Sequence, residues 1–267
     1  MTQSGTIRTG IGGWTFDPWE GSFYPETLPK RRQLEYASRE LAAIEVNGTY
    51  YSSQKPATFA KWASEVPDSF VFSLKASRFC TNRKVLAEAG PSVEKFLTQG
   101  ITELGAHLGP ILWQFMGTKK FEPEDFEAFL ALLPKSQDGI ALRHVVEPRH
   151  ASFQVPEFIA LLKKYEVAAV CADHHDYPMF ADPTADFVYA RLQKGEDDIP
   201  SCYPENEIEA WADRLRSFAK GGMPDDLPKI AEKETVAKKP RDVFAFFITG
   251  GKVNAPNGAR VLQAAVS

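Results

Sequence analysis

Short apolar runs recur along the chain, and most of them are followed by a segment whose apolar residues repeat with helical periodicity. At residues 7–11, Ile7, Thr9 and Ile11 alternate with single intervening residues, as in a strand. The runs predict strands over residues 7–11, 43–46, 70–74, 111–115, 140–146, 167–172, 187–192 and 243–248. The intervening periodicity predicts helices over residues 31–41, 56–65, 91–104, 123–133, 156–165, 205–218 and 259–265. Such alternation is typical of βα units that build a parallel sheet.

Eight strands are the number of a TIM-type (β/α)₈ barrel, which is the fold class that we predict. The barrel should be irregular around strands six and seven, because only ~14 residues separate them and leave little room for a crossover helix. The competing fold is an open doubly wound sheet, which normally has a glycine-rich turn before its first helix. Here Gly10, Gly12 and Gly13 lead into a long aromatic loop, so the match to a dinucleotide-binding motif is weak.

The length of 267 residues suits one barrel domain spanning residues 1–267, since such a domain typically needs ~250 residues. Hydrophobic residues make up 43% of the chain and charged residues 25%, as in folded globular proteins. Residues 220–242 are rich in glycine, proline and lysine, which predicts a long solvated connection before the last strand.

The net charge of −4 argues against a broad nucleic-acid-binding surface, although a locally basic pocket is compatible with it. The three cysteines, Cys80, Cys171 and Cys202, form no CxxC motif and suggest no disulfide framework. The first residues lack the apolar run of a signal peptide, and no stretch approaches the ~18 apolar residues of a membrane span. We therefore expect a cytoplasmic protein that does not bind a membrane.

Polar side chains stand at nearly every predicted strand end, where the active sites of barrel enzymes lie. These candidates are Glu45 and Asn47, Lys75, Gln114, Glu147, Arg149 and His150, Asp173, and Arg191. Some polarity is expected wherever a chain leaves the core. The mixture of carboxylates, cations and amides is harder to explain in that way and indicates a ligand pocket.

The segment from Glu147 to His150 is the most distinctive of these ends. If the strand continues through this segment, Glu147 and Arg149 share one face. Glu147 is then either a general acid/base whose charge is stabilised by Arg149, or one half of a structural ion pair. His150 is either a proton shuttle or a hydrogen-bonded loop residue. Lys75, Arg149 and Arg191 together suit recognition of a phosphate or carboxylate, unless each pairs with a neighbouring acid.

Residues 173–176, Asp-His-His-Asp, have the residue types of a metal site. Successive strand residues point to opposite sides, so all four cannot meet one ion. We therefore expect no metal or other cofactor, and take Asp173 alone as a pocket candidate. Trp14 in the first loop and Tyr50 after the second strand either stack on a ligand or pin the loops to the barrel.

Segments from Gly10 to the last helix resemble the YecE-like family, also called domain of unknown function 72. The most distinctive are Glu147-Pro148-Arg149-His150 and the Glu45-x-Asn47 segment; the others are residues 13–14, 19, 23–25, 48–51, 74–76, 108–115, 172–173 and 187–192. The resemblance implies a TIM barrel and no established activity. The family usually has His where Asn82 stands, and Asn where Thr249 and Gly258 fall, which implies altered or lost activity if those groups do chemistry elsewhere.

The leading functional hypothesis is a metal-independent hydrolase or lyase acting on a small anionic ligand, phosphorylated or sugar-like. Its catalytic residues would be Glu147, His150 and Asp173, and Trp14, Glu45, Asn47, Tyr50, Lys75, Gln114, Arg149 and Arg191 would bind the ligand. One alternative is a metal-dependent barrel that processes nucleic acid, in the manner of barrel endonucleases, although five histidines are few for such a site. The other is a non-catalytic ligand-binding barrel.

Overall fold

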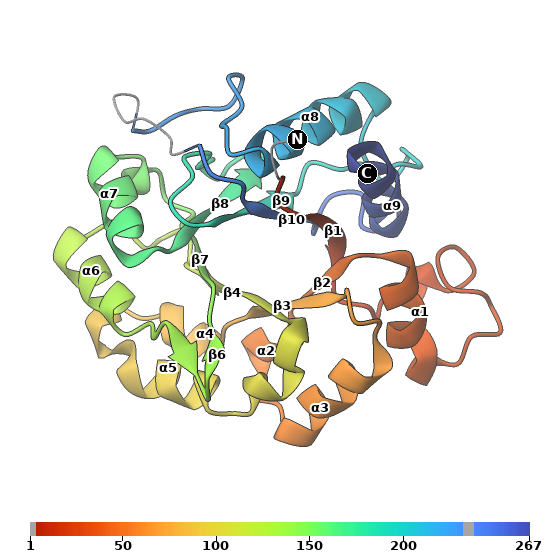
Figure 1. Cartoon of the computed structure of the whole chain (residues 1–267), viewed down its shortest axis with the longest axis horizontal. Helices are drawn as coiled ribbons and strands as arrows, with labels where there is room; N and C mark the ends of the chain where they lie inside the picture. The colour runs from red at the N-terminus through yellow and green to blue at the C-terminus, as the bar shows by residue number, and fades with distance from the viewer. Residues whose placement is uncertain (1–3, 232–237) are drawn as a thin grey trace.

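The computed structural model describes residues 4–231 and 238–267, and its centre is a closed barrel of eight parallel strands (Figure 1). The strand order around the barrel is β1-β10-β9-β8-β7-β4-β3-β2, so neighbours in sequence are neighbours in space. This architecture confirms the predicted TIM-type fold class. The barrel strands are β1 (Ile7–Gly12), β2 (Ala43–Val46), β3 (Val71–Lys75), β4 (Leu108–Gln114), β7 (His144–Glu147), β8 (Ala168–Asp173), β9 (Phe187–Leu192) and β10 (Asp242–Phe247).

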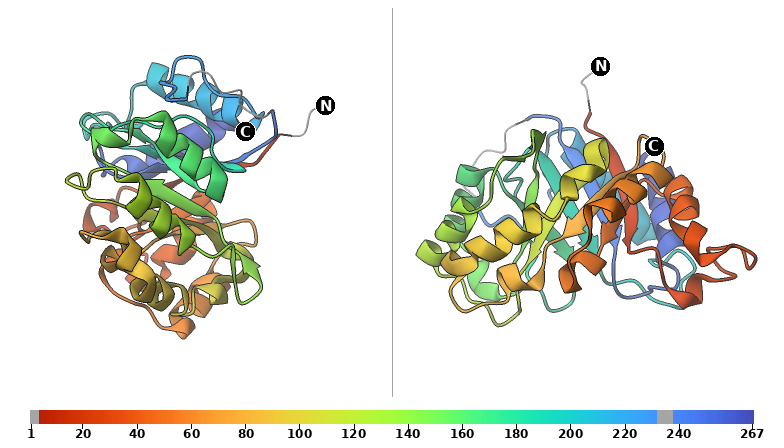
Figure 2. Two further views of the ribbon diagram at one scale, coloured as in Figure 1. Left: turned by 90° about the vertical axis from the view of Figure 1, so that its left-hand side faces the viewer. Right: turned by 90° about the horizontal axis from the view of Figure 1, so that it is seen from below.

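Helices surround the barrel on its outside (Figures 1 and 2). They are α1 (Gln33–Glu40), α3 (Pro56–Glu65), α5 (Gly90–Leu97), α6 (Pro123–Ala131), α7 (Pro156–Tyr165), α8 (Glu205–Ala219) and α9 (Ala255–Val266). Pro56, Pro123 and Pro156 occupy the first helical position, where a missing N–H costs nothing and the fixed φ suits the helix. Two short helices, α2 (Gly48–Tyr51) and α4 (Arg78–Thr81), directly follow β2 and β3.

The barrel is irregular where the sequence predicted it to be. The described residues 174–186, between β8 and β9, contain no helix. The predicted connection at 220–242 also has no helix over residues 220–231 and 238–241, and its residues 232–237 lie outside the described part of the chain.

The single strand predicted over residues 140–146 is wrong. A small antiparallel hairpin, β5 (Ser136–Gln137) and β6 (Ile140–Ala141), precedes β7 instead. Asp138 and Gly139 both have positive φ values, 48° and 79°, and make the tight two-residue turn that such a hairpin requires.

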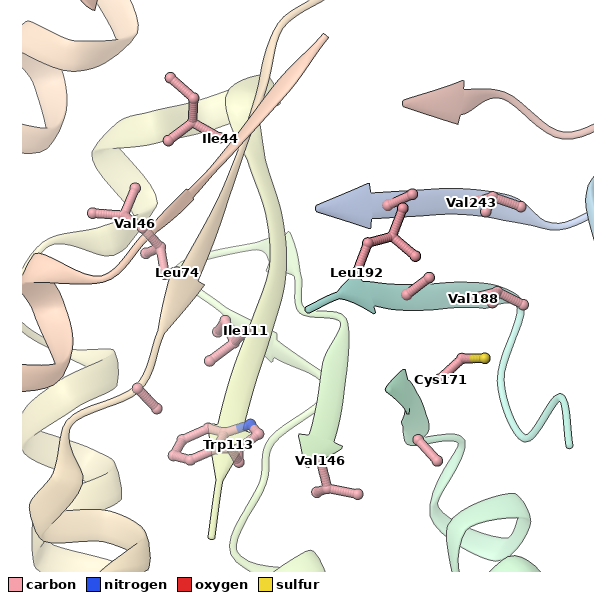
Figure 3. Close-up of a cluster of buried hydrophobic side chains, with 14 of the residues drawn as sticks. Ile44, Val46, Leu74, Ile111, Trp113, Val146, Cys171, Val188, Leu192 and Val243 are labelled. Atoms are coloured by element: carbon pink, nitrogen blue, oxygen red, sulfur yellow. The ribbon is translucent and has the colours of Figure 1, made fainter. Parts of the chain in front are cut away.

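Two apolar layers hold the barrel, and the period-two alternation of each strand decides which layer a side chain joins. Ile44, Leu74, Trp113, Val146 and Cys171 face outward and pack under the helices (Figure 3). The inner cluster is made of the alternate positions, and its members are Ala43, Val71, Leu112, Val145, Ala168, Val170, Ala172, Phe187, Tyr189, Phe244, Phe246 and Ile248. The same alternation places Glu45, Lys75, Gln114, Glu147 and Arg191 on the inner face.

No helix in the described residues is long and apolar enough to cross a membrane.

Candidate active site

The inner face of the barrel contains a buried ion-pair triad near the C-terminal strand ends. Arg191 on β9 donates from Nε and Nη2 to the two oxygens of Glu45 on β2, at 3.1 and 3.0 Å. Its Nη1 donates to Glu147 Oε1 on β7 at 2.6 Å. All three side chains are 1% exposed or less. Buried charges are stable only when they are paired and hydrogen-bonded, and here one guanidinium bonds to two carboxylates and balances one of their two negative charges.

Further hydrogen bonds fix Glu45. The hydroxyl of Tyr189 donates to Glu45 Oε2 at 2.8 Å and lies 2.8 Å from Ser73 Oγ. Ser73 Oγ in turn donates to the carbonyl of Pro110 at 2.9 Å. Burial, followed by the negative charge of Glu45, raises the pKa of Tyr189 well above its ordinary value, so Tyr189 remains a donor.

Arg149 bridges the triad to the barrel mouth. Its Nη2 donates to Gln114 Oε1 at 2.7 Å and to Glu147 Oε2 at 3.2 Å. Its guanidinium lies 4.4 Å from the ring centroid of Tyr177, a cation–π contact. Strand β7 ends at Glu147, so the condition that the strand continues to Arg149 is not met, but the two side chains still contact each other. Both carboxylate oxygens of Glu147 accept from arginines.

This environment keeps Glu147 ionised. Burial alone would raise the pKa of Glu147, but the positive charges of Arg191, Arg149 and Lys75 outweigh burial and lower it below its ordinary value. Burial alone would lower the pKa of Arg191, but the negative charges of Glu147 and Glu45 outweigh burial and raise it.

Lys75, the last residue of β3, has a different environment. Its side chain is 8% exposed, and its Nζ lies 4.4 Å from the ring centroid of Tyr50. Within residues 4–231 and 238–267 its ammonium makes no hydrogen bond or ion pair. Burial, followed by repulsion from Arg191, lowers the pKa of Lys75 to about 8, despite attraction from Glu45 and Glu147.

A cavity of about 730 Å³ opens above the triad at the C-terminal strand ends. Its wall includes seven of the residues predicted from the sequence: Trp14, Asn47, Tyr50, Lys75, Gln114, Arg149 and Arg191. The described wall contains four cations, the fourth being Lys252, and no Asp or Glu. Glu45 and Glu147 lie behind this wall, where they hold Arg191.

Sequence reasoning missed several residues of the wall. Gln193 follows Arg191 by two residues, and strand alternation could have placed it on the same face. Its side chain is 7% exposed, and its Oε1 is buried with no partner in the described structure. Trp62 comes from a helix and Lys252 from the loop after β10, and no periodicity predicts where such side chains point.

None of the three predicted catalytic residues belongs to the cavity wall: Glu147 lies behind it, bonded to Arg191 and Arg149, and the other two make their contacts elsewhere. Asp173 faces outward, on the side of Cys171, where it accepts from Tyr203 OH at 3.0 Å and pairs with Lys194 at 2.9 Å. The Nδ1 of His150 accepts from the backbone N–H of Ser152 at 3.1 Å and caps the 3₁₀ turn Ala151–Phe153. Their predicted catalytic roles have no support from this geometry.

The described residues contain no group of three His, Cys, Asp or Glu side chains placed to hold one metal ion. In the Asp-His-His-Asp segment, His174 stacks on Tyr177 at a centroid distance of 3.9 Å. Its Nδ1 accepts from the backbone N–H groups of Asp176 and Tyr177. These contacts match the loop interpretation of the segment better than the ligand interpretation.

The three departures from the family pattern occupy different places. Asn82 donates to the hydroxyl of Tyr50 at 3.2 Å, just outside the wall, and Thr249 is part of the wall. Gly258 lies away from the cavity on α9. A Cβ atom there would come within 2.7 Å of the Ser201 carbonyl oxygen, so no Asn side chain fits this site without a shift.

The family described as "Protein of unknown function DUF72" matches residues 8–267. The chain belongs to the DUF72 family. DUF72 proteins of known structure share its fold: one from Thermotoga maritima MSB8 superposes with a TM-score of 0.71 at 21% identity, over 97% of this chain and 99% of the other. One from Enterococcus faecalis V583 has a TM-score of 0.70 at 18% identity, over 98% and 95% of the two chains.

The DUF72 barrel is also similar to the structure of SacUVDE, with a TM-score of 0.56 at 10% identity over 97% of this chain and 98% of the other. At such identities the likeness concerns the fold alone. No curated protein matches the sequence.

Proposed function

We propose that this DUF72 chain is a metal-independent hydrolase or lyase that acts on a small anionic ligand, phosphorylated or sugar-like. One observation carries the proposal: the described wall of the cavity holds four cations and no carboxylate. Arginine offers a forked set of donors to a phosphate or carboxylate, and lysine adds a point charge. An anion in the cavity would therefore meet complementary charge on several sides.

The other wall residues suit a polar, ring-shaped ligand. Asn47, Gln114 and Gln193 present amides that can bond to hydroxyl groups. Trp14, Tyr50 and Trp62 add aromatic surface on which a sugar ring can pack.

The buried triad has a positioning role in this proposal. Glu147 is a carboxylate with a lowered pKa and both oxygens engaged, so it is poorly suited to donate a proton near pH 7. It instead fixes Arg191 and Arg149 at the base of the cavity. Lys75, with a pKa of about 8, is the wall residue best suited to exchange a proton near neutral pH.

The proposal is tested by thermal unfolding of the wild-type protein with sugar phosphates, sugar acids and the corresponding neutral sugars. Charged ligands should raise Tm, whereas neutral sugars should leave it unchanged. Ligands that bind are then followed for product formation with EDTA present, and Glu147→Gln should lose turnover because Arg191 is left misplaced.

Three results would count against the proposal in different ways. Equal stabilisation by neutral sugars would contradict the anionic ligand. Activity that disappears with EDTA and returns with added metal would support the metal-dependent alternative. Binding of charged ligands without any product would favour a non-catalytic ligand-binding barrel.

A further inference from the structure

Lys75 is a buried lysine, and in the described part of the chain no carboxylate oxygen lies within ion-pair distance of its amine. Lys119 and Lys194 each lie within 3.0 Å of a carboxylate oxygen, at 2.8 and 2.9 Å. Lys75 is more buried than either, yet the printed contact of its amine is with the Tyr50 ring, at the wall of the cavity. A buried ammonium without a partner is costly, so burial lowers the pKa of the amine and increases its unprotonated fraction.

The ion-pair triad of Arg191, Glu45 and Glu147 explains why the Lys75 amine has no carboxylate partner. Glu45 and Glu147 are near enough to attract Lys75 electrostatically, but their oxygens already accept from Arg191, Tyr189 and Arg149. Arg191 and Arg149 both repel a charged Lys75. The negative charges of the network are therefore paired with the arginines. The amine of Lys75 is left unprotonated in roughly a tenth of the molecules at pH 7.

The cavity around this amine has room and further bonding groups for a ligand. Gln193 Oε1 and Arg149 Nε are buried polar atoms without a partner in the described structure, and both residues belong to the wall. Both atoms are fully buried, so a ligand would reach them only if these side chains moved. A polar ligand in the cavity would instead meet the amides and cations that line its wall.

We propose that Lys75 is a nucleophile that forms an imine with the carbonyl carbon of an anionic aldehyde or ketone. The inference rests on the proposed function, because Arg149, Arg191 and Lys252 would hold the anionic group. It narrows that function to a lyase whose substrate carries both a carbonyl and a phosphate or carboxylate.

The covalent steps balance without an oxidant or reductant. The Nζ lone pair attacks the carbonyl carbon, the carbonyl π pair moves to oxygen, and proton transfer followed by loss of one water gives the protonated imine. Where Cβ carries a hydroxyl group, water takes the proton of that hydroxyl, the oxygen forms a carbonyl with Cβ, and the electron pair of the Cα–Cβ bond moves to the protonated imine as the bond breaks. This releases a second carbonyl fragment and leaves an enamine. Protonation of the enamine carbon and addition of water then release the remaining carbonyl product and restore the amine.

The test uses pyridoxal 5′-phosphate, an aldehyde that carries a phosphate, on the wild-type protein at pH 7. Borohydride reduces any imine to a stable amine, and peptide mass mapping then locates the labelled lysines. Lys75 should be labelled at least tenfold faster than the exposed Lys61 and Lys135, because roughly a tenth of its amine is unprotonated at pH 7. Pyridoxal without the phosphate should label Lys75 more slowly, inorganic phosphate should protect it, and Lys75→Arg should lose the fast label.

The outcomes separate the two proposals. Labelling of Lys75 no faster than Lys61 and Lys135 would overturn the imine, even if phosphate still raised the Tm of the protein. Fast labelling of Lys75 that is indifferent to the phosphate group and to added phosphate would support the nucleophile and contradict the anionic ligand. Both measurements use the wild-type chain, so they do not depend on whether a Lys75 variant folds.

Discussion

At the scale of single residues, the site depends on how one arginine is shared. Arg191 uses three nitrogens to hold Glu45 and Glu147, and this leaves Lys75 without an acid of its own. Removing one partner of a buried pair typically costs about 3–5 kcal/mol, because the other charge stays buried and unpaired. The polar character of the cavity is therefore a property of the whole network and not of any one side chain.

The unpaired charge of Lys75 should destabilise the fold near neutral pH. The pKa is about 8 in the folded protein and near 10.5 unfolded, so between these values the unfolded chain binds a proton that the folded chain lacks. Stability contributed by this site is thus lowest below pH 8 and rises up to about pH 10.5. Lys75→Met should be more stable than wild type at pH 7 by up to about 3 kcal/mol, and less so as the pH rises.

Urea unfolding at pH 7 and pH 9.5 measures this effect. The exposed Lys61→Met variant is the control and should show the same difference from wild type at both pH values. A Lys75→Met variant that is less stable than wild type at pH 7, with no dependence on pH, would show that the ammonium is well solvated.

His144 should make the fold sensitive to acid. Its Nδ1 accepts from Trp113 Nε1 at 3.1 Å, its Nε2 lies 2.8 Å from the Pro134 carbonyl oxygen, and burial lowers its pKa to about 4. Between pH 6.5 and 4 the unfolded chain gains a proton at this residue and the folded chain does not. Stability should therefore fall by up to about 3 kcal/mol as the pH drops through this range.

Comparison with His144→Gln isolates this contribution, because glutamine keeps a donor for the Pro134 carbonyl and does not titrate. The free energy of unfolding of the variant should change less than that of wild type between pH 7 and pH 4.5. Equal slopes for the two proteins would assign the acid sensitivity to other groups.

At the scale of the elements, strand alternation made most of the barrel predictable. Strands 43–46 and 187–192 and helices 56–65 and 156–165 agree with the structure at both ends, because their apolar periods are clear. The same alternation explains why Glu45, Lys75, Gln114 and Arg191 meet and why Asp173 does not. The β5–β6 hairpin was missed because its strands are two residues each, too short for any period to show.

Residues outside the strands could not be placed in this way. Tyr177, Trp62 and Lys252 reach the site from a loop, a helix and the segment after β10, and their positions depend on packing. His150 looked catalytic by its neighbours in sequence, but the chain turns there and uses its imidazole as a cap.

Helix α9 is seated closely enough to require glycine at position 258. A Cβ atom there would lie 2.7 Å from the Ser201 carbonyl oxygen and 2.9 Å from both Cys202 Cβ and Phe247 Cε1. Gly258→Ala should therefore destabilise the protein by about 1–3 kcal/mol, as overpacking typically does. Gly117→Ala, where a Cβ atom meets nothing within 4 Å, is the matched control in urea unfolding. Equal stability of the two variants would mean that α9 shifts freely.

At the scale of the whole molecule, an acidic protein with a net charge of −4 gathers cations in one cavity. Each barrel strand contributes few polar groups, and closure of the barrel brings them to a single rim. Low dielectric walls strengthen the field of such a cluster, so a small anion should bind there more readily than the overall charge suggests.

The most direct test of this account is a titration of the Lys75 amine by NMR, with Lys75→Met used to assign its signal, in the absence and presence of inorganic phosphate. The account predicts a pKa of about 8 without phosphate and a clearly higher value with it, because a bound anion stabilises the ammonium. A pKa near the ordinary lysine value, or one that does not change when phosphate is added, would contradict the claim that this cavity binds an anion.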